Sequence, residues 1–482
     1  MTKPAQDVLD APDSSRTAAH GTAWRLASYG VSLLVSVVSI RLLTTHLGLG
    51  FGTLTVVSSI AFVAVASTDG GLSALGLREG ANVTRAERID LLANVLGLRL
   101  VLCTAGMFAG AGFALATNRG ASFSLGVFIV GFGSMMAMLQ GALAIHLQLD
   151  LRIAAVATLE LVKTVALTAT YAALVLAGSG LTGFYFAPAA AGLAMLVATI
   201  PLVPRELLRP RFHRPAWKRM VRAVLPYSLA AAIAILYFRV TQIAMSYTAT
   251  AVETTQYAFA FRIVEVLSVI PGLVASSALP LLSRASVSGH ERFRLFVTSL
   301  SSTAVLAGMA LATATGAAAP LAIRVIGGDG ASTSVDVLRL LAIAIAFTFP
   351  LTIWSFLLIS VERYSALALG GALAALSALV LAITLVPPFG AIGGALATVG
   401  GEVVLASVLF RTIAQFDRAL IPRPGRFVRP LAALVAPVAI IAATRHDGMV
   451  LPLLAMPAFA IAALGFRAVP PELFDIVRRR QT

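Results

Sequence analysis

The chain has 482 residues, 59% of them hydrophobic and 12% charged, and its mean hydropathy is +0.92. Soluble domains carry about a quarter of charged residues, so this composition excludes an ordinary water-soluble domain and indicates an integral membrane protein. The net charge of +15 would suggest nucleic acid for a soluble protein. Here the distribution of the charges explains it better, and we expect no nucleic-acid partner.

Apolar segments of about 20 residues, the length that crosses a hydrocarbon core, recur from Thr22 to Phe466. They are predicted to be helices, because a backbone in lipid must satisfy its own hydrogen bonds and because the segments are too long and too uniformly apolar for barrel strands. The predicted fold class is an all-α integral membrane protein with about 14 transmembrane helices. The fourteen spans are 22–44, 51–76, 90–115, 122–145, 153–177, 181–203, 222–245, 256–281, 294–316, 336–360, 363–386, 388–413, 427–444 and 449–466.

The basic residues predict the orientation of the chain. With a cytoplasmic N-terminus, 27 of the 36 Lys and Arg residues lie in inner loops and tails, whereas the outer loops hold four, Arg119, Arg324, Arg339 and Arg445. Because cytoplasmic loops carry the excess of Lys and Arg, both termini are predicted to be cytoplasmic, in a multi-pass protein of the cytoplasmic (inner) membrane. The first apolar run leads directly into the next span, so we expect no cleaved signal peptide. Cys103 is the single cysteine, which excludes an intramolecular disulfide.

The spans fall into six, six and two, which suggests an internally repeated transporter with its pathway between two pseudo-repeated six-helix bundles. The repeat is faint in the sequence: Arg41 and Arg239 each lie near the outer end of the first span of a lobe. The predicted domains are a disordered cytoplasmic tail (1–21), an N-terminal six-helix lobe (22–203), a basic cytoplasmic linker (204–221), a C-terminal six-helix lobe (222–414), a second basic linker (415–426), transmembrane helices 13 and 14 (427–466) and a cytoplasmic tail (467–482).

The first basic linker, from Pro204 to Arg219, allows two readings. Its arginines and Trp217 would suit anionic lipid headgroups or a partner enzyme at the membrane surface. A solvated loop that only sets the topology is the reading we prefer.

Once the charged residues near span ends are counted with the loops, nine ionisable residues remain within the predicted spans, and charges in a bilayer normally face a bundle interior or a wet cavity. Asp69 and Arg99 are predicted at similar depth and are expected to pair. Glu160 and Lys163 are three residues apart on one helical face and can neutralise each other. For these four a structural role is favoured. The nine are Arg41, Asp69, Arg99, Glu160, Lys163, Arg239, Arg262, Glu265 and Glu402.

The outer half of the membrane holds Arg41, Arg239 and Arg262, with Glu265 as the single acidic neighbour. Arginine stays ionised and offers a planar fork of donors that suits phosphate oxygens. The functional reading is therefore a site for the diphosphate of a lipid carrier. The alternative is that Arg41 reaches outward to the headgroups and that Arg262 pairs with Glu265 three residues on.

Glu402 lies near the middle of a predicted span without a partner close in sequence. A buried carboxylate can exchange protons or bind a cation, which would make Glu402 an ion-coupling residue. An ion pair with a basic residue of another helix is the alternative.

Common motifs of nucleotide binding, metal binding and hydrolysis are absent from the sequence. The sequence has no P-loop, no H-E-x-x-H, no cysteine cluster and no G-x-S-x-G, and the longest outer loop, 317–335, is too short for a catalytic domain. We therefore expect no enzyme, no cofactor and no metal site.

Several short motifs resemble those of one transporter family in order and spacing. Together with the six-six-two layout they are similar to the polysaccharide and O-antigen flippases of the multidrug/oligosaccharidyl-lipid/polysaccharide exporter superfamily. Leu49-Gly50 departs from the pattern, which usually has Pro or an acidic residue there. The motifs are Arg41-Leu42-Leu43, Leu47-Gly48, Phe51-Gly52, Asp69-Gly70-Gly71-Leu72, Arg78, Y-A-F-A-F-R (257–262), V-L-R-L-L-A-I-A-I-A-F (337–347) and F-G-A-I-G-G-A-L-A-T (389–398).

The resemblance implies a pair of six-helix bundles that alternates between inward-open and outward-open states and moves a polyprenyl-diphosphate-linked oligosaccharide to the outer leaflet. It implies that the last two helices form a groove for the lipid tail, with peripheral packing as the alternative. Expected partners are the lipid-linked glycan, membrane lipids and a polysaccharide polymerase or glycosyltransferases. The rival interpretation is a cation-coupled multidrug exporter of the same superfamily, for which an acid-dominated cavity is expected. A polytopic glycosyltransferase or polymerase is a remote third.

Overall fold

The computed structural model describes residues 14–275, 290–328, 331–421, 425–444, 451–466 and 468. Throughout these ranges the elements are helices and no strand occurs. Among the described residues, ten helices are long and apolar enough to cross a membrane, and three shorter apolar helices span Gly50–Ala66, Val428–Ala443 and Pro452–Gly465. The 53-residue helix α14 (Tyr364–Phe416) contains two of the predicted spans. The predicted fold class, all-α with about 14 transmembrane helices, is therefore confirmed.

The chain divides into two compact units. The N-terminal unit comprises Met1–Gly48 and Val57–Ala232, and the C-terminal unit comprises Leu49–Val56 and Ile233–Thr482. The division falls within helix α9 (Arg214–Thr248), and the last two helices belong to the C-terminal unit.

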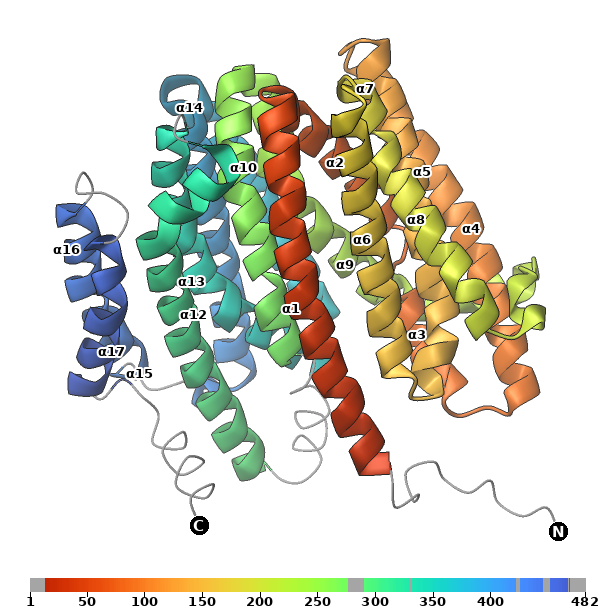
Figure 1. The fold of residues 1–482 in the computed structure, drawn as a ribbon. Coiled ribbons are helices and arrows are strands. Elements are labelled where there is room, and N and C mark those ends of the chain that lie inside the picture. Colours follow the sequence, from red (N-terminus) through yellow and green to blue (C-terminus); the bar gives the residue numbers. More distant parts are fainter. Residues whose placement is uncertain are drawn as a thin grey trace. The chain divides into compact units, whose positions relative to one another are not determined.

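The N-terminal unit is a helical bundle in which α1 packs on α6, α4 packs on α5, and α8 packs on both α5 and α6 (Figure 1). Its core is a continuous cluster of aliphatic and methionine side chains such as Leu92, Ile145 and Met195. Its elements are α1 (Ser14–Leu47), most of α2 (Gly50–Ala66), α3 (Leu72–Gly80), α4 (Arg85–Ala116), α5 (Ala121–Leu149), α6 (Ile153–Leu176), α7 (Leu181–Phe184), α8 (Phe186–Thr199), η2 (Ile200–Leu202), η3 (Arg205–Leu208) and the first part of α9 (Arg214–Thr248).

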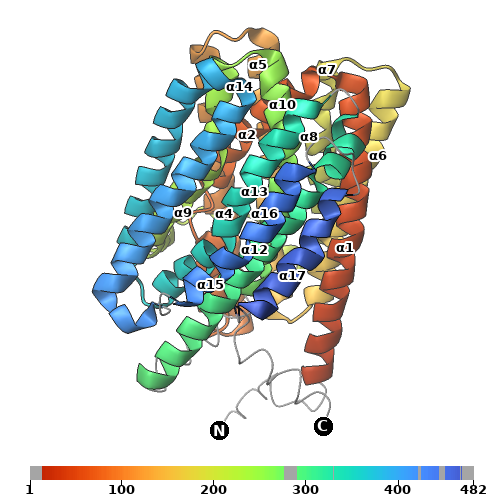
Figure 2. The same ribbon diagram turned by 90° about the vertical axis from the view of Figure 1, so that its left-hand side faces the viewer.

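The C-terminal unit is organised around α13, which packs against α10, α12 and α14. The last helices, α16 and α17, pack on each other and on α12 (Figure 2). The elements after α9 are α10 (Ala251–Leu267), α12 (His290–Gly327), α13 (Ser332–Ser360), α14, η4 (Arg418–Leu420), α15 (Gly425–Ala433), α16 (Val435–Ala443), η5 (Leu451–Leu454) and α17 (Ala455–Gly465).

The predicted span 51–76 is not one continuous helix. Helix α2 ends at Ala66 and α3 begins at Leu72, with Gly70 and Gly71 between them at φ of 50° and 81°. Only glycine adopts these left-handed angles without a steric penalty. The close approach of the Tyr227 ring to Gly71 and a hydrogen bond from the Ser228 hydroxyl to the Gly70 carbonyl hold the turn in place.

The spans predicted at 363–386 and 388–413 lie within α14, which is interrupted at Gly390 by a non-helical backbone with φ of 55° and ψ of −132°. The side chain of Glu253 fills the place that a Cβ atom would take at Gly390. Pro387 and Pro388 precede the break, and proline removes backbone donors from a helix. The two halves of α14 pack side by side in opposite directions, since the Arg363 guanidinium lies 5.3 Å from the ring centre of Phe416 and a Cβ atom at Gly370 would contact Leu409. The predicted boundary near residue 387 is thus a tight turn at Gly390 between two spans.

The first basic linker is folded onto the start of α4. The backbone N–H of Arg211 donates to the carbonyl of Ala93 at 3.0 Å, and Nε1 of Trp217 donates to the carbonyl of Asn94 at 3.1 Å. Arg211 also forms an ion pair with Asp90. The expectation of a solvated loop was therefore incomplete. The helix α1 likewise begins at Ser14, within the segment predicted as a tail.

Candidate anion and ion-coupling site

Two of the predicted arginines meet on one carboxylate in the C-terminal unit. Nη1 of Arg262 lies 2.6 Å from Oε2 of Glu265, three residues on in α10, and Nη2 of Arg239 in α9 contacts Oε1 of the same carboxylate. The side chains are 13% exposed for Arg239, 34% for Arg262 and 23% for Glu265. With all three ionised, the cluster keeps a net charge of about +1 within apolar helices, where positive charge is costly unless a polar group compensates it.

Aromatic rings support this cluster. The Arg239 guanidinium lies 5.4 Å from the ring centre of Phe238 and 5.8 Å from that of Phe261. The electron-rich face of a ring attracts a cation at such distances. The Phe238 and Phe261 rings are 5.3 Å apart, and Phe261 stacks on the fully buried Tyr257. Aromatic packing on α9 and α10 thus fixes the direction of the Arg239 guanidinium.

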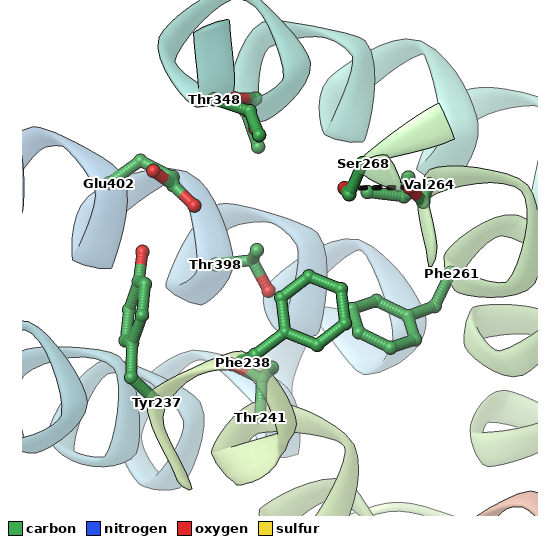
Figure 3. Close-up of a pocket in the computed structure, with 10 residues that line it drawn as sticks. Tyr237, Phe238, Thr241, Phe261, Val264, Ser268, Thr348, Thr398 and Glu402 are labelled. Carbon is green, nitrogen blue, oxygen red and sulfur yellow. Dashed lines mark hydrogen bonds between the residues drawn. The ribbon is translucent and has the colours of Figure 1, made fainter. Parts of the chain in front are cut away.

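Phe238 and Phe261 also line a small cavity of about 20 Å³ in the same unit. This volume suits one occupant of the size of a water molecule, for which roughly 10–15 Å³ is enough. Figure 3 shows the Tyr237 hydroxyl pointing toward the Glu402 carboxylate at its wall. The lining residues are Tyr237, Phe238, Thr241, Phe261, Val264, Ser268, Ala344, Thr348, Thr398 and Glu402.

Glu402 is the one charged residue of this lining. Within the described part of the chain no basic side chain forms an ion pair with it, so the alternative of a structural salt bridge is not what the structure shows. The other polar groups at the wall are hydroxyls. One of them, the Thr398 hydroxyl, lies 2.9 Å from that of Tyr257. A carboxylate among hydroxyls offers oxygen ligands alone, the donor set that hard cations prefer, or a chain for proton transfer.

The remaining predicted residues lie in the N-terminal unit. Arg41 is exposed on α1. Arg99 is 1% exposed and forms an ion pair with Asp69. Its Nη1 also donates to the Met138 carbonyl at 3.0 Å and its Nη2 to the Ser73 hydroxyl at 2.9 Å. These contacts indicate a structural role, in which Arg99 holds α4 against α3 and α5.

Glu160 and Lys163 pair at 3.3 Å on the surface of α6, with side-chain exposures of 58% and 39%. Both are too exposed to line an enclosed site in this unit. Their arrangement suits mutual neutralisation on a helix face.

Sequence reasoning missed two features of the site. The partner of Arg239 lies 26 residues away, on the next helix. The hydroxyl lining of the cavity was also overlooked, although Thr241, Thr348 and Thr398 are polar positions within apolar spans, which was the available signal. Among the described residues there is no group of three or more His, Cys, Asp or Glu side chains that would hold a metal ion.

By sequence, neither a protein-family model nor a curated protein matches the chain. Solved structures do. Lipid II flippase MurJ in an inward closed conformation superposes with a TM-score of 0.71 at 11% identity, covering 94% of this chain and 99% of that one. A multidrug resistance MATE family transporter of the MOP superfamily, in an inward-facing conformation, gives 0.68 at 14% identity over 83% and 98% of the two chains.

A third similar structure is a MOP superfamily transporter from Pyrococcus furiosus, for which a binding pocket of reverse polarity has suggested a different function. Its TM-score is 0.58 at 16% identity, with 87% of this chain and 99% of that chain covered. At these identities the similarity shows the fold. The chain has the all-helical fold that lipid flippases and multidrug transporters of the MOP superfamily share, and its fold neighbours are transporters rather than enzymes.

Proposed function

We propose that this protein is a flippase that moves a polyprenyl-diphosphate-linked oligosaccharide, a precursor of a cell-surface polysaccharide, from the inner to the outer leaflet by alternating access. The observation that carries the proposal is the Arg239–Arg262–Glu265 cluster. It places two guanidinium forks on one carboxylate, so that within these three side chains two positive charges face one negative charge. A diphosphate is the anionic part of such a substrate, and arginine forks suit its oxygens.

The fold supports this proposal, since lipid II flippase MurJ is among the similar structures. In the proposed cycle Arg239 and Arg262 contact the diphosphate, and Arg41 is proposed as a further contact. The protein would lie in the cytoplasmic membrane, with membrane lipids around it and a polysaccharide polymerase or glycosyltransferases as partners in the same process.

A cation-coupled multidrug exporter is the second candidate. The Glu402 cavity favours it, because a carboxylate without a basic partner among the described residues suits proton or cation exchange. Similar structures of multidrug transporters are consistent with it. The arginine surplus beside this cavity argues against a cationic drug as the substrate.

A reconstituted system tests the proposal. Vesicles would contain the purified protein and a polyprenyl-diphosphate-linked oligosaccharide with a fluorescent sugar, and external dithionite would report the share of sugar in the outer leaflet. We expect the wild type to raise this share above that of protein-free vesicles. We also expect Arg363→Ala, an arginine at the start of α14 and outside the cluster, to do the same.

The exporter hypothesis is tested with the same vesicles, which are loaded with a cationic dye and placed under a proton or sodium gradient. Dye efflux without movement of the lipid-linked sugar would replace the flippase proposal by the exporter. Movement of the sugar without dye efflux would support the flippase.

A further inference from the structure

A second, larger cavity lies in the C-terminal unit, away from the Glu402 cavity and sharing no lining residue with it. Its volume is about 900 Å³, and it is bounded by the first turns of α12, the last turns of α14, η4 and the start of α15. A neighbouring hollow of about 430 Å³ shares Phe410, Ala414 and Arg418 with it and adds Arg411 and Gln415. The large cavity is lined by Glu291, Arg294, Leu295, Thr298, Phe410, Ala414, Arg418, Ala419, Ile421 and Arg426.

The charge of this lining is basic. The lining contains three arginines, Arg294, Arg418 and Arg426, and one acidic residue, Glu291. Arg411 adds a further positive charge in the neighbouring hollow. Asp417 does not line either cavity. Guanidinium groups that converge on a hollow from separate helices are the usual arrangement for binding phosphate.

The frame around these arginines is ordered by specific contacts. Asp417 caps η4 by accepting a hydrogen bond from the backbone N–H of Ala419 at 2.9 Å, and its other oxygen lies 3.6 Å from Nε of Arg294. Arg294 on α12 is thereby tied to the turn that carries Arg418. The site is built from three elements and is not a row of charges on one helix.

An apolar wall adjoins the arginines. The side chains of Leu295 and Phe410 are 65% and 42% exposed, and Ile421 continues this side of the cavity. A free phosphate would leave that wall without a partner, whereas an amphiphile with a phosphate head and an acyl chain would contact both parts. Such a ligand would also be in contact with α12, α14 and α15 at once.

We propose that this cavity binds one anionic phospholipid, with its headgroup phosphate on Arg294, Arg418 and Arg426 and its acyl chain along Leu295 and Phe410. These arginines lie at helix ends that the charge distribution assigns to the cytoplasmic side, where the membrane surface is negative. The lipid links the start of α12 to the end of α14 and to the helices that follow. The inference goes beyond the transport proposal, because it concerns a lipid that stays bound and is not carried.

The test measures lipid binding to the full-length purified protein in neutral detergent. Phosphatidylglycerol, phosphatidylcholine and inorganic phosphate are titrated separately, with the thermal midpoint and native mass spectrometry as readouts. We expect phosphatidylglycerol alone to raise the midpoint and to remain bound. The triple variant Arg294→Gln/Arg418→Gln/Arg426→Gln should bind it about fivefold more weakly for each arginine removed, as expected for basic side chains near an anionic lipid.

Two further variants separate this site from general surface charge. Arg205→Gln/Arg209→Gln/Arg222→Gln removes the same charge from the other basic segment and should keep the phosphatidylglycerol effect. Ala414→Phe places an aromatic ring in the wall of the cavity without changing its charge and should weaken phosphatidylglycerol binding. The proposal is overturned by an equal loss in the matched triple variant, by unchanged binding in Ala414→Phe, or by inorganic phosphate producing the full shift.

Discussion

Glu265 sets the charge that the arginine cluster offers to a substrate. It accepts from Arg262 on its own helix and from Arg239 on α9, so one negative charge is divided between two guanidiniums. A purely structural cluster would be most stable with its charges balanced, because uncompensated charge is costly in this environment. An anion site, in contrast, gains from the remaining positive charge. The two roles therefore predict opposite responses to removal of the carboxylate.

The first prediction follows from this contrast. Arg239→Ala should lower the rate of sugar movement in the vesicle assay about 10- to 100-fold, the loss expected when a charged hydrogen-bond partner is removed. Arg239→Lys should recover only part of the rate, because lysine keeps the charge and loses the fork. Glu265→Gln should keep transport and lower the half-saturating concentration of the lipid-linked substrate.

Thermal midpoints of the same purified variants are the control for folding. If transport and midpoint fall together in Arg239→Ala, Arg262→Ala and Glu265→Gln, the cluster is structural and the anion site lies elsewhere.

The second prediction concerns the Glu402 cavity. Glu402→Gln keeps the shape of the side chain and removes its charge, so it should leave binding of the transported substrate intact while abolishing the dependence of transport on a proton or sodium gradient. Glu206→Gln, which changes an exposed carboxylate on η3, is the matched control. Gradient dependence that survives in Glu402→Gln would assign the coupling to other residues.

The limits of the sequence at this scale have a physical cause. The Arg262–Glu265 pair could be predicted from the sequence, since residues three apart in a helix lie on one face. The Arg239–Glu265 contact was not, because it depends on the rotation of α9 against α10, which the packing of Phe238 and Phe261 sets. The role of Glu402 was proposed from its isolation in the sequence, whereas most of its hydroxyl surroundings, those of Tyr237, Thr241 and Thr348 among them, come from other helices.

At the scale of elements, glycines determine where two chain segments change direction. Hydropathy reports which residues lie in lipid and is silent about backbone angles, so it did not predict the break between α2 and α3 at Gly70 and Gly71. It did predict a boundary near residue 387, but not the left-handed backbone at Gly390 that makes the turn there. The element types and nearly all spans were predictable, because membrane thickness fixes their length. The basic linker folds onto α4 through individual hydrogen bonds, which the hydropathy and charge patterns of the sequence do not predict.

The third prediction addresses the turn at Gly71. Gly71→Ala forces a Cβ atom toward the Tyr227 ring and holds alanine at a φ of 81°, an angle that costs an ordinary residue about 1–2 kcal/mol. The thermal midpoint of the detergent-solubilised protein should fall by about 3 °C or more.

Two glycine controls separate backbone strain from the clash with the ring. Gly178 has a φ of +63° and no atom within 4 Å of the place that a Cβ atom would take, so Gly178→Ala should lower the midpoint by less. Gly112 is helical with equally open surroundings, and Gly112→Ala should have no destabilising effect. Equal midpoints for all three variants would show that the turn is not strained.

At the scale of the whole molecule, the distribution of basic residues gives the chain a direction in the membrane. The 27-to-4 division of Lys and Arg between predicted inner and outer segments alternates through thirteen loops, which a wrong number of spans would disturb. In the described part of the chain, ten helices have the length needed to cross a membrane, and three shorter apolar helices lie at the remaining positions. Orientation remains a prediction from charge, since helix geometry is the same for either direction of crossing.

The fourth prediction is that both termini and the basic linker are cytoplasmic. In a Cys103→Ser background, cysteines at Ser14 and Pro215 should react with an impermeant thiol reagent only after the cells are opened, whereas a cysteine at Asn118, in a predicted outer loop, should react in intact cells. Pro215 and Asn118 are both exposed, so accessibility within the fold does not limit their reaction. Cys103 is buried, and its Sγ lies 3.3 Å from the Thr68 hydroxyl. A serine at this position can keep that hydrogen bond, so the Cys103→Ser background should fold.

Labelling of Pro215→Cys in intact cells, together with protection of Asn118→Cys, would invert the orientation. The arginine cavity between α12, α14 and α15 would then face the outer surface, and the anionic lipid proposed for it would have to come from the outer leaflet.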